Sequence, residues 1–291
     1  LFPMRRVGAR GSGEWKRISW DAALDEMADR LADVRSKYGP MSIAGAVSGA
    51  AFSRGAVMAL LMRSIGSPNW MINQDLCGGC QALSEKITGI PMKNGEDIDN
   101  AQCAMLVGRN PYAADPTQWR ALKALKKRGG RIVVIDPIQG PASRIADVYL
   151  RPRPGTDAAL ALSIAHLLVK WGSYDSEFVE RWCHGFEQYK ERIDKFSPEV
   201  AARLTGVSIS DIVAAAKAYS AGPSVFVPGH GIDAFSAGVQ TFRAFDCLVA
   251  ISGNLDRLGG NRLTKKPTGF RTYLDLIHDP QFRLPVEVER Q

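Results

Sequence analysis

Two short apolar segments on either side of a helical pattern constrain the fold of this chain more than any other feature. Residues 103–107 and 131–135 have the apolar character of buried strands, and residues 117–127 between them have the pattern of a helix. Parallel strands joined in this way form a βαβ crossover. Further strands at 148–151 and 224–227 alternate with helical segments. The sequence therefore predicts an α/β fold with doubly wound, mostly parallel sheets and flanking helices.

The rest of the chain completes two predicted domains. Residues 19–38 carry apolar side chains at helical spacing, and an apolar segment at 41–47 leads into a second helix. We expect residues 1–72 to form the first part of a discontinuous α/β domain and residues 73–258 to form a second, ligand-binding α/β domain. Residues 259–291 lose periodicity and are expected to return to the first domain as irregular chain.

Composition argues against several classes of protein. The formal net charge is +7, but the 37 Lys and Arg residues are interspersed with 30 Asp and Glu residues, which disfavours nucleic-acid binding. No apolar run approaches the length of a membrane span. The 5 cysteines are too few and too irregularly spaced for a disulfide framework.

Glycine-containing and polar turns lie next to the predicted strands, where ligands bind in open parallel sheets. The turns are Gly108-Arg109-Asn110-Pro111, Asp136-Pro137, Gly155-Thr156-Asp157 and Gly229-His230-Gly231. Each alone is typical of an ordinary turn, but together they predict a site for a large nucleotide-like ligand. None is a GxGxxG fingerprint or a Walker P-loop, which argues against simple NAD binding or ATP hydrolysis.

The motif Cys77-Gly78-Gly79-Cys80 is open to three functional interpretations: a redox-active thiol pair, half of a zinc site, or one thiolate ligand beside an incidental cysteine. No second CxxC or CxxH motif exists, which disfavours a four-ligand zinc site. Residues 69–76 are expected to be a loop, whereas a thioredoxin-like motif follows a strand directly. A single thiolate suits a soft, redox-active metal.

Of the four histidines, His230 is the one placed for function, because it lies between glycines at a strand end. A turn-packing role is the alternative. We predict His230 and Cys77 as catalytic residues.

An ordered set of motifs extends over nearly all of the chain. The set comprises PMRRVG at 3–8, WKRISWDAAL at 15–24, DIDN at 97–100, GRNP at 108–111, IDP at 135–137, RIAD at 144–147, PGTDAAL at 154–160, SGNL at 252–255 and GGN at 259–261. In this order it resembles the molybdopterin oxidoreductases, which include dimethyl sulfoxide reductase, formate dehydrogenase and polysulfide reductase.

The resemblance implies a bis(molybdopterin guanine dinucleotide) cofactor with molybdenum or tungsten. Residues at the strand ends are then expected to contact its pyrophosphate, ribose or guanine: Gly108, Asn110, Asp136, Arg144, Gly155, Thr156 and Asp157. Gly229 and Gly231 are expected to line the pterin.

The resemblance also places the protein ligand to the metal in the loop before residues 98–100, where Cys77 fits. Formate dehydrogenases typically carry His after this ligand, whereas Gly78 follows it here, so that activity is disfavoured. Polysulfide or thiosulfate reductases, nitrate reductases of the periplasmic kind and acetylene hydratase-like tungsten enzymes all remain compatible with a Cys ligand.

Family members usually carry an iron–sulfur segment before the position of Leu1 and a further pterin-binding domain beyond that of Gln291. A [4Fe-4S] cluster is therefore expected in a further part of the protein or in a partner subunit. The expected partners are an iron–sulfur electron-transfer subunit or domain and a small-molecule substrate. The competing interpretation is a non-catalytic electron-transfer or scaffold subunit that keeps the fold without the metal.

Overall fold

The structure, a computed structural model, describes residues 1–48, 52–73, 77–91, 94–263 and 280. The chain divides into two compact units, of which the first includes Leu1–Asn73 and the second is Gln74–Lys266. Within the described residues, no helix is both long enough and apolar enough to cross a membrane.

The first unit contains a short hairpin, a long helix and a βαβ element. β1 (Met4–Arg6) pairs antiparallel with β2 (Trp15–Arg17). The predicted helix at 19–38 is confirmed as α1 (Trp20–Tyr38), which begins where the Ser19 hydroxyl accepts the N–H of Ala22 at 3.1 Å. The 3₁₀ helix η1 (Pro40–Ser42) follows. β3 (Gly45–Val47) and β4 (Trp70–Ile72) are parallel, and α2 (Phe52–Ile65) connects them.

A four-stranded parallel sheet forms the centre of the second unit. Its strands lie in the order β8 (Val148–Leu150), β7 (Arg131–Ile135), β6 (Cys103–Val107) and β9 (Ser224–Pro228). The chain runs outward from β6 through β7 to β8 and then returns to the other side of β6 as β9. The direction of winding therefore reverses between β6 and β9, and the predicted doubly wound α/β fold is confirmed.

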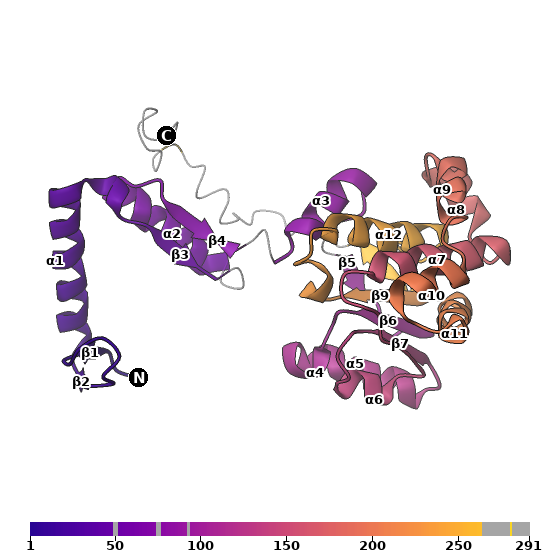
Figure 1. The fold of residues 1–291 in the computed structure, drawn as a ribbon, viewed down its shortest axis with the longest axis horizontal. Coiled ribbons are helices and arrows are strands. Elements are labelled where there is room, and N and C mark those ends of the chain that lie inside the picture. Colours follow the sequence, from indigo (N-terminus) through magenta and orange to yellow (C-terminus); the bar gives the residue numbers. More distant parts are fainter. Residues whose placement is uncertain (49–51, 74–76, 92–93, 264–279, 281–291) are drawn as a thin grey trace. The chain divides into compact units, whose positions relative to one another are not determined.

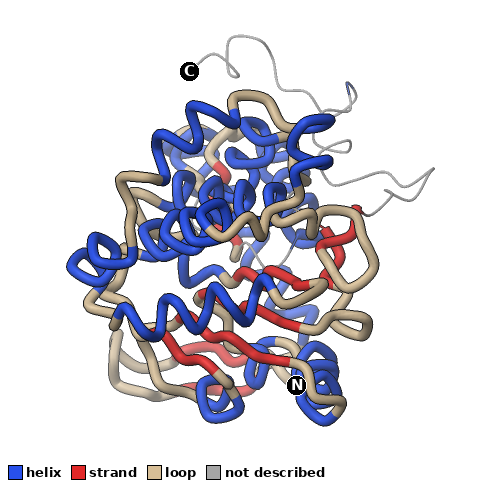
Figure 2. Tube along the Cα trace, turned by 90° about the vertical axis from the view of Figure 1, so that its right-hand side faces the viewer, coloured by secondary structure: helices blue, strands red, loops and turns tan. Residues whose placement is uncertain are grey.

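Helices cover both faces of this sheet (Figure 1). On one face lie α4 (Pro111–Ala114), α5 (Pro116–Lys127) and α6 (Pro141–Ile145). On the other lie α7 (Asp157–Lys170), α11 (Ile209–Ser220) and α12 (Gly238–Ile251). The other helices are α3 (Gly79–Thr88), α8 (Ser176–Trp182), α9 (Phe186–Ile193), α10 (Pro198–Thr205) and the 3₁₀ helix η3 (His230–Ile232). Helix is accordingly the most abundant element in Figure 2.

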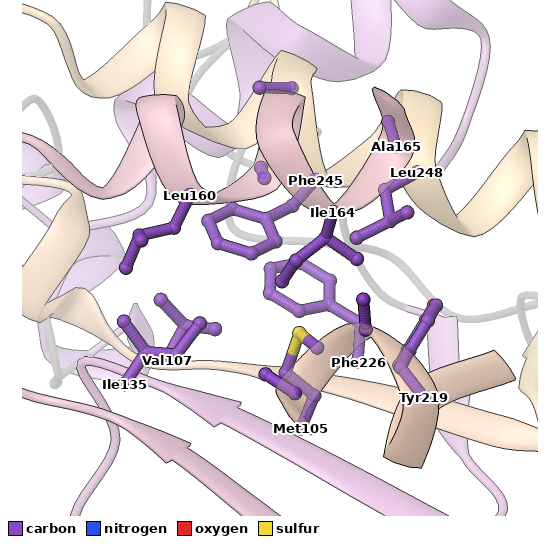
Figure 3. Close-up of a cluster of buried hydrophobic side chains, with 14 of the residues drawn as sticks. Met105, Val107, Ile135, Leu160, Ile164, Ala165, Tyr219, Phe226, Phe245 and Leu248 are labelled. Atoms are coloured by element: carbon purple, nitrogen blue, oxygen red, sulfur yellow. The ribbon is translucent and has the colours of Figure 1, made fainter. Parts of the chain in front are cut away.

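Alternate residues of the central strands build two apolar layers. Met105 and Val107 of β6 pack among buried side chains of α7 and α12, including Ile164 and Phe245 (Figure 3). Leu106 belongs to the opposite layer, with side chains of α5. Because both faces of the sheet are covered, its strands are apolar except for Arg131 and Ser224, which begin β7 and β9, and they lack a polar–apolar alternation.

Two regions differ from the sequence-based expectations. Residues 69–76 were expected to be a loop, but residues 70–72 form β4, in parallel pairing with β3. Residues 259–263 were expected in the first domain, but β10 (Asn261–Leu263) pairs with β5 (Asn94–Glu96) in the second unit. Asn261 fixes this position because its buried side chain exchanges hydrogen bonds with the backbone of Phe226 at 2.8 and 2.9 Å. The expected course of residues 264–279 and 281–291 lies outside the described residues.

Candidate functional site

The carboxyl ends of the four central strands form one continuous edge. The N–H of Gly229, after β9, donates to the Val107 carbonyl of β6 at 2.8 Å. The N–H of Gly108, after β6, donates to Ile135 of β7 at 2.9 Å, and Asp136, after β7, donates to β8 at 3.1 Å. The predicted turn residues at 108, 136 and 229 are thus neighbours across the edge. Between β6 and β9 the winding reverses, and α/β proteins commonly bind ligands at such a switch point.

Glycines allow the turns after β6 and β9 to pack backbone against backbone. A Cβ on Gly229 would lie 1.9 Å from the Gly108 carbonyl oxygen, and one on Gly231 would lie 2.8 Å from the same atom. Gly108 itself has φ +56°, in the region that favours glycine. These three glycines therefore have a structural role at the switch point, and their contact with a cofactor remains a prediction.

Cys77 and His230 meet next to this edge. The Cys77 Sγ lies 3.7 Å from the His230 Nε2, although 153 positions separate the two residues in the sequence. His230 sits in η3, directly after β9, and its side chain is about half exposed. Cys77 precedes Gly78, which caps α3 with φ +95°. The two residues predicted as catalytic from the sequence therefore come together in the fold.

Asp233 forms hydrogen bonds to His230 and to the residues that follow Cys77, and the sequence analysis did not predict this role. Its carboxylate is fully buried and accepts the N–H of Gly78, the N–H of Cys80 at 3.0 Å, and a hydrogen bond from His230 Nδ1 at 3.0 Å. The only signal in the sequence is an aspartate three residues after the histidine, which is the spacing of one turn of η3. A buried carboxylate needs such donors, because an unpaired charge is costly in the interior.

Cys80 has a different environment from Cys77. Its Sγ donates to the Asp233 carbonyl oxygen at 3.1 Å. Burial, and then the negative charge of Asp233, raise the pKa of Cys80, so this side chain remains a protonated thiol. All 5 cysteines are free thiols. Of the pair, Cys77 is the one whose sulfur lies beside a histidine.

Two carboxylates occupy the other end of the edge. Asp136 follows β7, and Asp157 begins α7 after the turn at Gly155. Burial raises the pKa of Asp157 to about 6, and the nearby Asp136 adds to the increase. Burial also raises the pKa of Asp136, whose Oδ1 accepts the N–H of Ile138 at 2.8 Å. This end of the edge therefore offers acceptors to a ligand that brings hydrogen-bond donors.

The other predicted ligand-binding residues are spread along the same edge. Asn110 is exposed at the start of α4, where its side chain makes no capping hydrogen bond. Arg144 is exposed on α6. The Thr156 hydroxyl donates to the Arg153 carbonyl oxygen at 2.6 Å, which orders the turn before α7. The structure locates these residues, and their contact with a ligand remains a prediction.

Comparison with known proteins decides the family. The model of the molybdopterin oxidoreductase family matches residues 1–270. The chain belongs to the molybdopterin oxidoreductase family. It is 35% identical to acetylene hydratase of Syntrophotalea acetylenica over 233 residues, which cover 78% of this chain and 32% of that protein. It is 31% identical to formate dehydrogenase H of Escherichia coli, and the match covers 84% of this chain and 35% of that protein. It is also 31% identical to the thiosulfate reductase molybdopterin-containing subunit PhsA of Salmonella typhimurium, and this match covers 89% of this chain and 34% of that protein.

A solved structure supports the same family. The structure of acetylene hydratase from Pelobacter acetylenicus matches with a TM-score of 0.69 at 33% identity, over 87% of this chain and 35% of that one. The chain thus spans about a third of the length of the molybdopterin oxidoreductases that it matches. The resemblance drawn from the ordered motifs is confirmed.

The residues at the strand ends fit a molybdopterin cofactor, which the family implies together with molybdenum or tungsten. Asp157 is a buried acid at a helix start, and a purine that brings N–H donors would satisfy it. The glycine turns expose backbone without side chains at the switch point. Cys77 would supply a thiolate, a soft ligand suited to molybdenum or tungsten.

Proposed function

We propose that this chain forms the cofactor-embracing part of a catalytic subunit that carries bis(molybdopterin guanine dinucleotide) with molybdenum or tungsten, and that Cys77 is the protein ligand to the metal. The observation that carries the proposal is the contact of 3.7 Å between Cys77 Sγ and His230 Nε2. The buried Asp233 orients the histidine through its hydrogen bond with Nδ1. When bound, the cofactor supplies the redox chemistry, and the protein orients and tunes it.

His230 is placed to accept the proton of the Cys77 thiol. Its Nδ1 faces the Asp233 carboxylate at 3.0 Å, so this nitrogen carries a proton and Nε2 is the acceptor of the neutral ring. The proton of the Cys77 thiol can then pass to His230 Nε2, which leaves the thiolate that metal binding requires. The half-exposed ring can exchange this proton with solvent or with a substrate.

Asp233 also positions the proposed ligand loop. It accepts the N–H groups of Gly78 and Cys80, the residues that follow Cys77 and open α3. A second anchor lies one helix turn further on, where the Ser84 hydroxyl donates to the buried Asp246 of α12 at 2.5 Å. The start of α3, directly after Cys77, is therefore held by Asp233 in the segment after β9, and the middle of α3 is held by α12.

Among members of the family, we propose that this chain resembles the thiosulfate reductases or acetylene hydratases more than the formate dehydrogenases. Gly78 has φ +95° and gives its N–H to Asp233. A histidine at this position would be strained in that backbone region, which supports the expectation that formate is not the substrate. The proposed partners are an iron–sulfur subunit or domain with a [4Fe-4S] cluster and a small-molecule substrate.

Metal and nucleotide analysis of the purified assembly tests the proposal. We expect molybdenum or tungsten together with iron, and guanine nucleotide released on denaturation. Cys77→Ala is expected to abolish thiosulfate reduction or acetylene hydration with the fold intact, whereas the matched variant Cys80→Ala retains activity. Unchanged turnover in Cys77→Ala would refute the ligand assignment. A folded and complete assembly without metal and nucleotide would favour the scaffold interpretation.

One observation favours a second candidate, a redox-active pair of Cys77 and Cys80. α3 begins at Gly79, so the two cysteines flank the start of a helix, which is the usual place of a CxxC redox motif. The candidate predicts that mild oxidation removes two titratable thiols and that a reductant restores them. If oxidised and reduced chains both titrate as 5 independent thiols, the redox pair is refuted.

A further inference from the structure

A cavity lies in the helical layer, on elements that do not carry Cys77 or His230. Its volume is about 400 Å³, within the range of small-molecule sites. Its walls come from the first turns of α7, from α9 and α10, and from α12. We call it the helix-layer pocket.

Most of the helix-layer pocket is apolar. Leu162 of α7, Phe196, Leu204 of α10 and Ala244 of α12 line it. Leu204 is 44% exposed, so an apolar surface is open to solvent there. A ligand with a ring or a hydrocarbon chain would cover this surface, and the burial would favour binding.

Two arginines give the pocket a positive charge. Arg192 of α9 and Arg243 of α12 line it, and none of the described lining residues carries a carboxylate. Neither guanidinium forms an ion pair with another described residue. Arg192 lies 5.2 Å from the ring centroid of Phe196, and Arg243 Nη1 donates to Gln240 Oε1 at 3.4 Å. These weak contacts leave most of the N–H donors of both groups available to an anion.

The wall of the pocket also holds an unsatisfied polar atom. The Tyr189 hydroxyl is buried and has no hydrogen-bond partner among the described residues. Buried hydroxyls nearly always have a partner. This one has almost no accessible surface, so a ligand in the pocket would not contact it directly. Burial, and then the neighbouring Cys247, hold the pKa of Tyr189 well above its usual value, so the hydroxyl remains a neutral donor.

We propose that the helix-layer pocket binds a small organic anion that has an apolar ring or chain, such as an aromatic carboxylate. The apolar lining would hold the body of the ligand, and Arg192 and Arg243 would hold its charge. The pocket shares neither Cys77 nor His230 with the metal site. Gly155 and Thr156, which were predicted to contact the cofactor, belong to its lining, so the test must separate this ligand from a nucleotide.

Calorimetric titration of the full chain tests the proposal with two matched probes, naphthalene-2-carboxylate and the neutral 2-naphthylmethanol. We expect the carboxylate to bind roughly 10- to 100-fold more tightly, since each charge-assisted hydrogen bond contributes on this scale. Arg192→Gln and Arg243→Gln, singly and together, should remove this preference. Arg120→Gln changes an exposed arginine of α5 and should leave both affinities unaltered.

Two further measurements exclude other sites. Ala158→Phe places a ring in the pocket and should abolish binding of both probes, while circular dichroism checks that the variant folds. GMP should not compete with the carboxylate, since competition would assign the pocket to a nucleotide arm of the cofactor. The proposal is refuted if both probes bind alike, if the carboxylate binds more weakly than roughly 1 mM, if Ala158→Phe still binds it, or if GMP displaces it.

Discussion

Asp233 shows how one buried side chain can serve several groups of a site. It is the hydrogen-bond partner of His230 within the same short turn, and of Gly78 and Cys80, which lie 155 and 153 positions away in the sequence. His230 belongs to the segment after β9, whereas Gly78 and Cys80 open α3. The carboxylate thus couples the orientation of the histidine ring to the position of the Cys77 loop.

Replacing this single residue, as in Asp233→Asn, should affect both the stability of the protein and its metal content. Asparagine keeps the shape but offers only one acceptor oxygen, so at least one buried N–H loses its partner. The free energy of unfolding is expected to fall by about 1–3 kcal/mol, and less metal should be retained by the assembly. Urea denaturation and elemental analysis measure the two effects. Asp99→Asn, at an exposed position, is the control, and equal behaviour of the two variants would contradict the prediction.

Between elements, the packing of α3 against α12 determines where the Cys77 loop can lie. Ser84 of α3 and Asp246 of α12 are both buried and joined by a hydrogen bond of 2.5 Å. Burial raises the pKa of Asp246 to about 6, while the Ser84 hydroxyl opposes the increase. At neutral pH the folded protein therefore holds a buried charge at this contact, which lowers its stability.

The pH dependence of stability follows from the sign of this shift. The pKa of Asp246 is higher in the folded chain than in the unfolded chain, so the folded state binds the proton more tightly between about pH 4 and pH 6. Stability should rise as the pH falls from 7 toward 5. Asp246→Asn removes the buried charge, and we expect it to raise the free energy of unfolding at pH 7 by at most about 3 kcal/mol, and by less as the pH falls.

Urea denaturation of both proteins from pH 5 to pH 8 measures this difference. Asp157 has a similarly raised pKa, so the variant should keep part of the pH dependence. Asp211→Asn, at an exposed position on α11, serves as the control. A difference between the Asp246 variant and the original chain that does not change with pH would contradict the assignment.

For the whole molecule, the stability of the second unit depends on the apolar layer between the sheet and helices α7 and α12. Phe245 is fully buried, and its ring stacks on Phe226 with centroids 4.9 Å apart. The same layer holds β6 and β9 against α12 (Figure 3). Gly108 and Gly229 directly follow these two strands. Packing in this layer therefore supports the switch point.

Phe245→Ala should leave a cavity in this layer and lower the free energy of unfolding of the second unit by about 3–5 kcal/mol. Hydrogen exchange followed by mass spectrometry can locate the effect. Peptides from α7 and α12 should lose protection, while those from α1 and α2, in the other compact unit, should not. Phe235→Ala, at a position that is 40% exposed, is the control. Equal loss of protection in both units would show that they unfold together.

The sequence by itself determined the central strands, most of the long helices and the family. These features depend on local patterns: apolar segments of strand length, capped helices, and motifs in a fixed order. It also singled out Cys77 and His230 as candidate site residues, because a CxxC motif and a histidine between glycines are conspicuous in the chain. The short elements β4, β5, β10 and α3 were missed, since three-residue strands and a glycine-led helix carry little periodicity.

Only the tertiary structure decided which residues meet. Cys77 and His230 are 153 positions apart, and it is the reversal of winding between β6 and β9 that creates the edge where they lie together. Asp233 and Asp246 owe their roles to burial, and burial depends on how α3 packs on the segment after β9 and on α12. Local sequence patterns encode elements and motifs, whereas the environment of a charged group is a property of the packed fold.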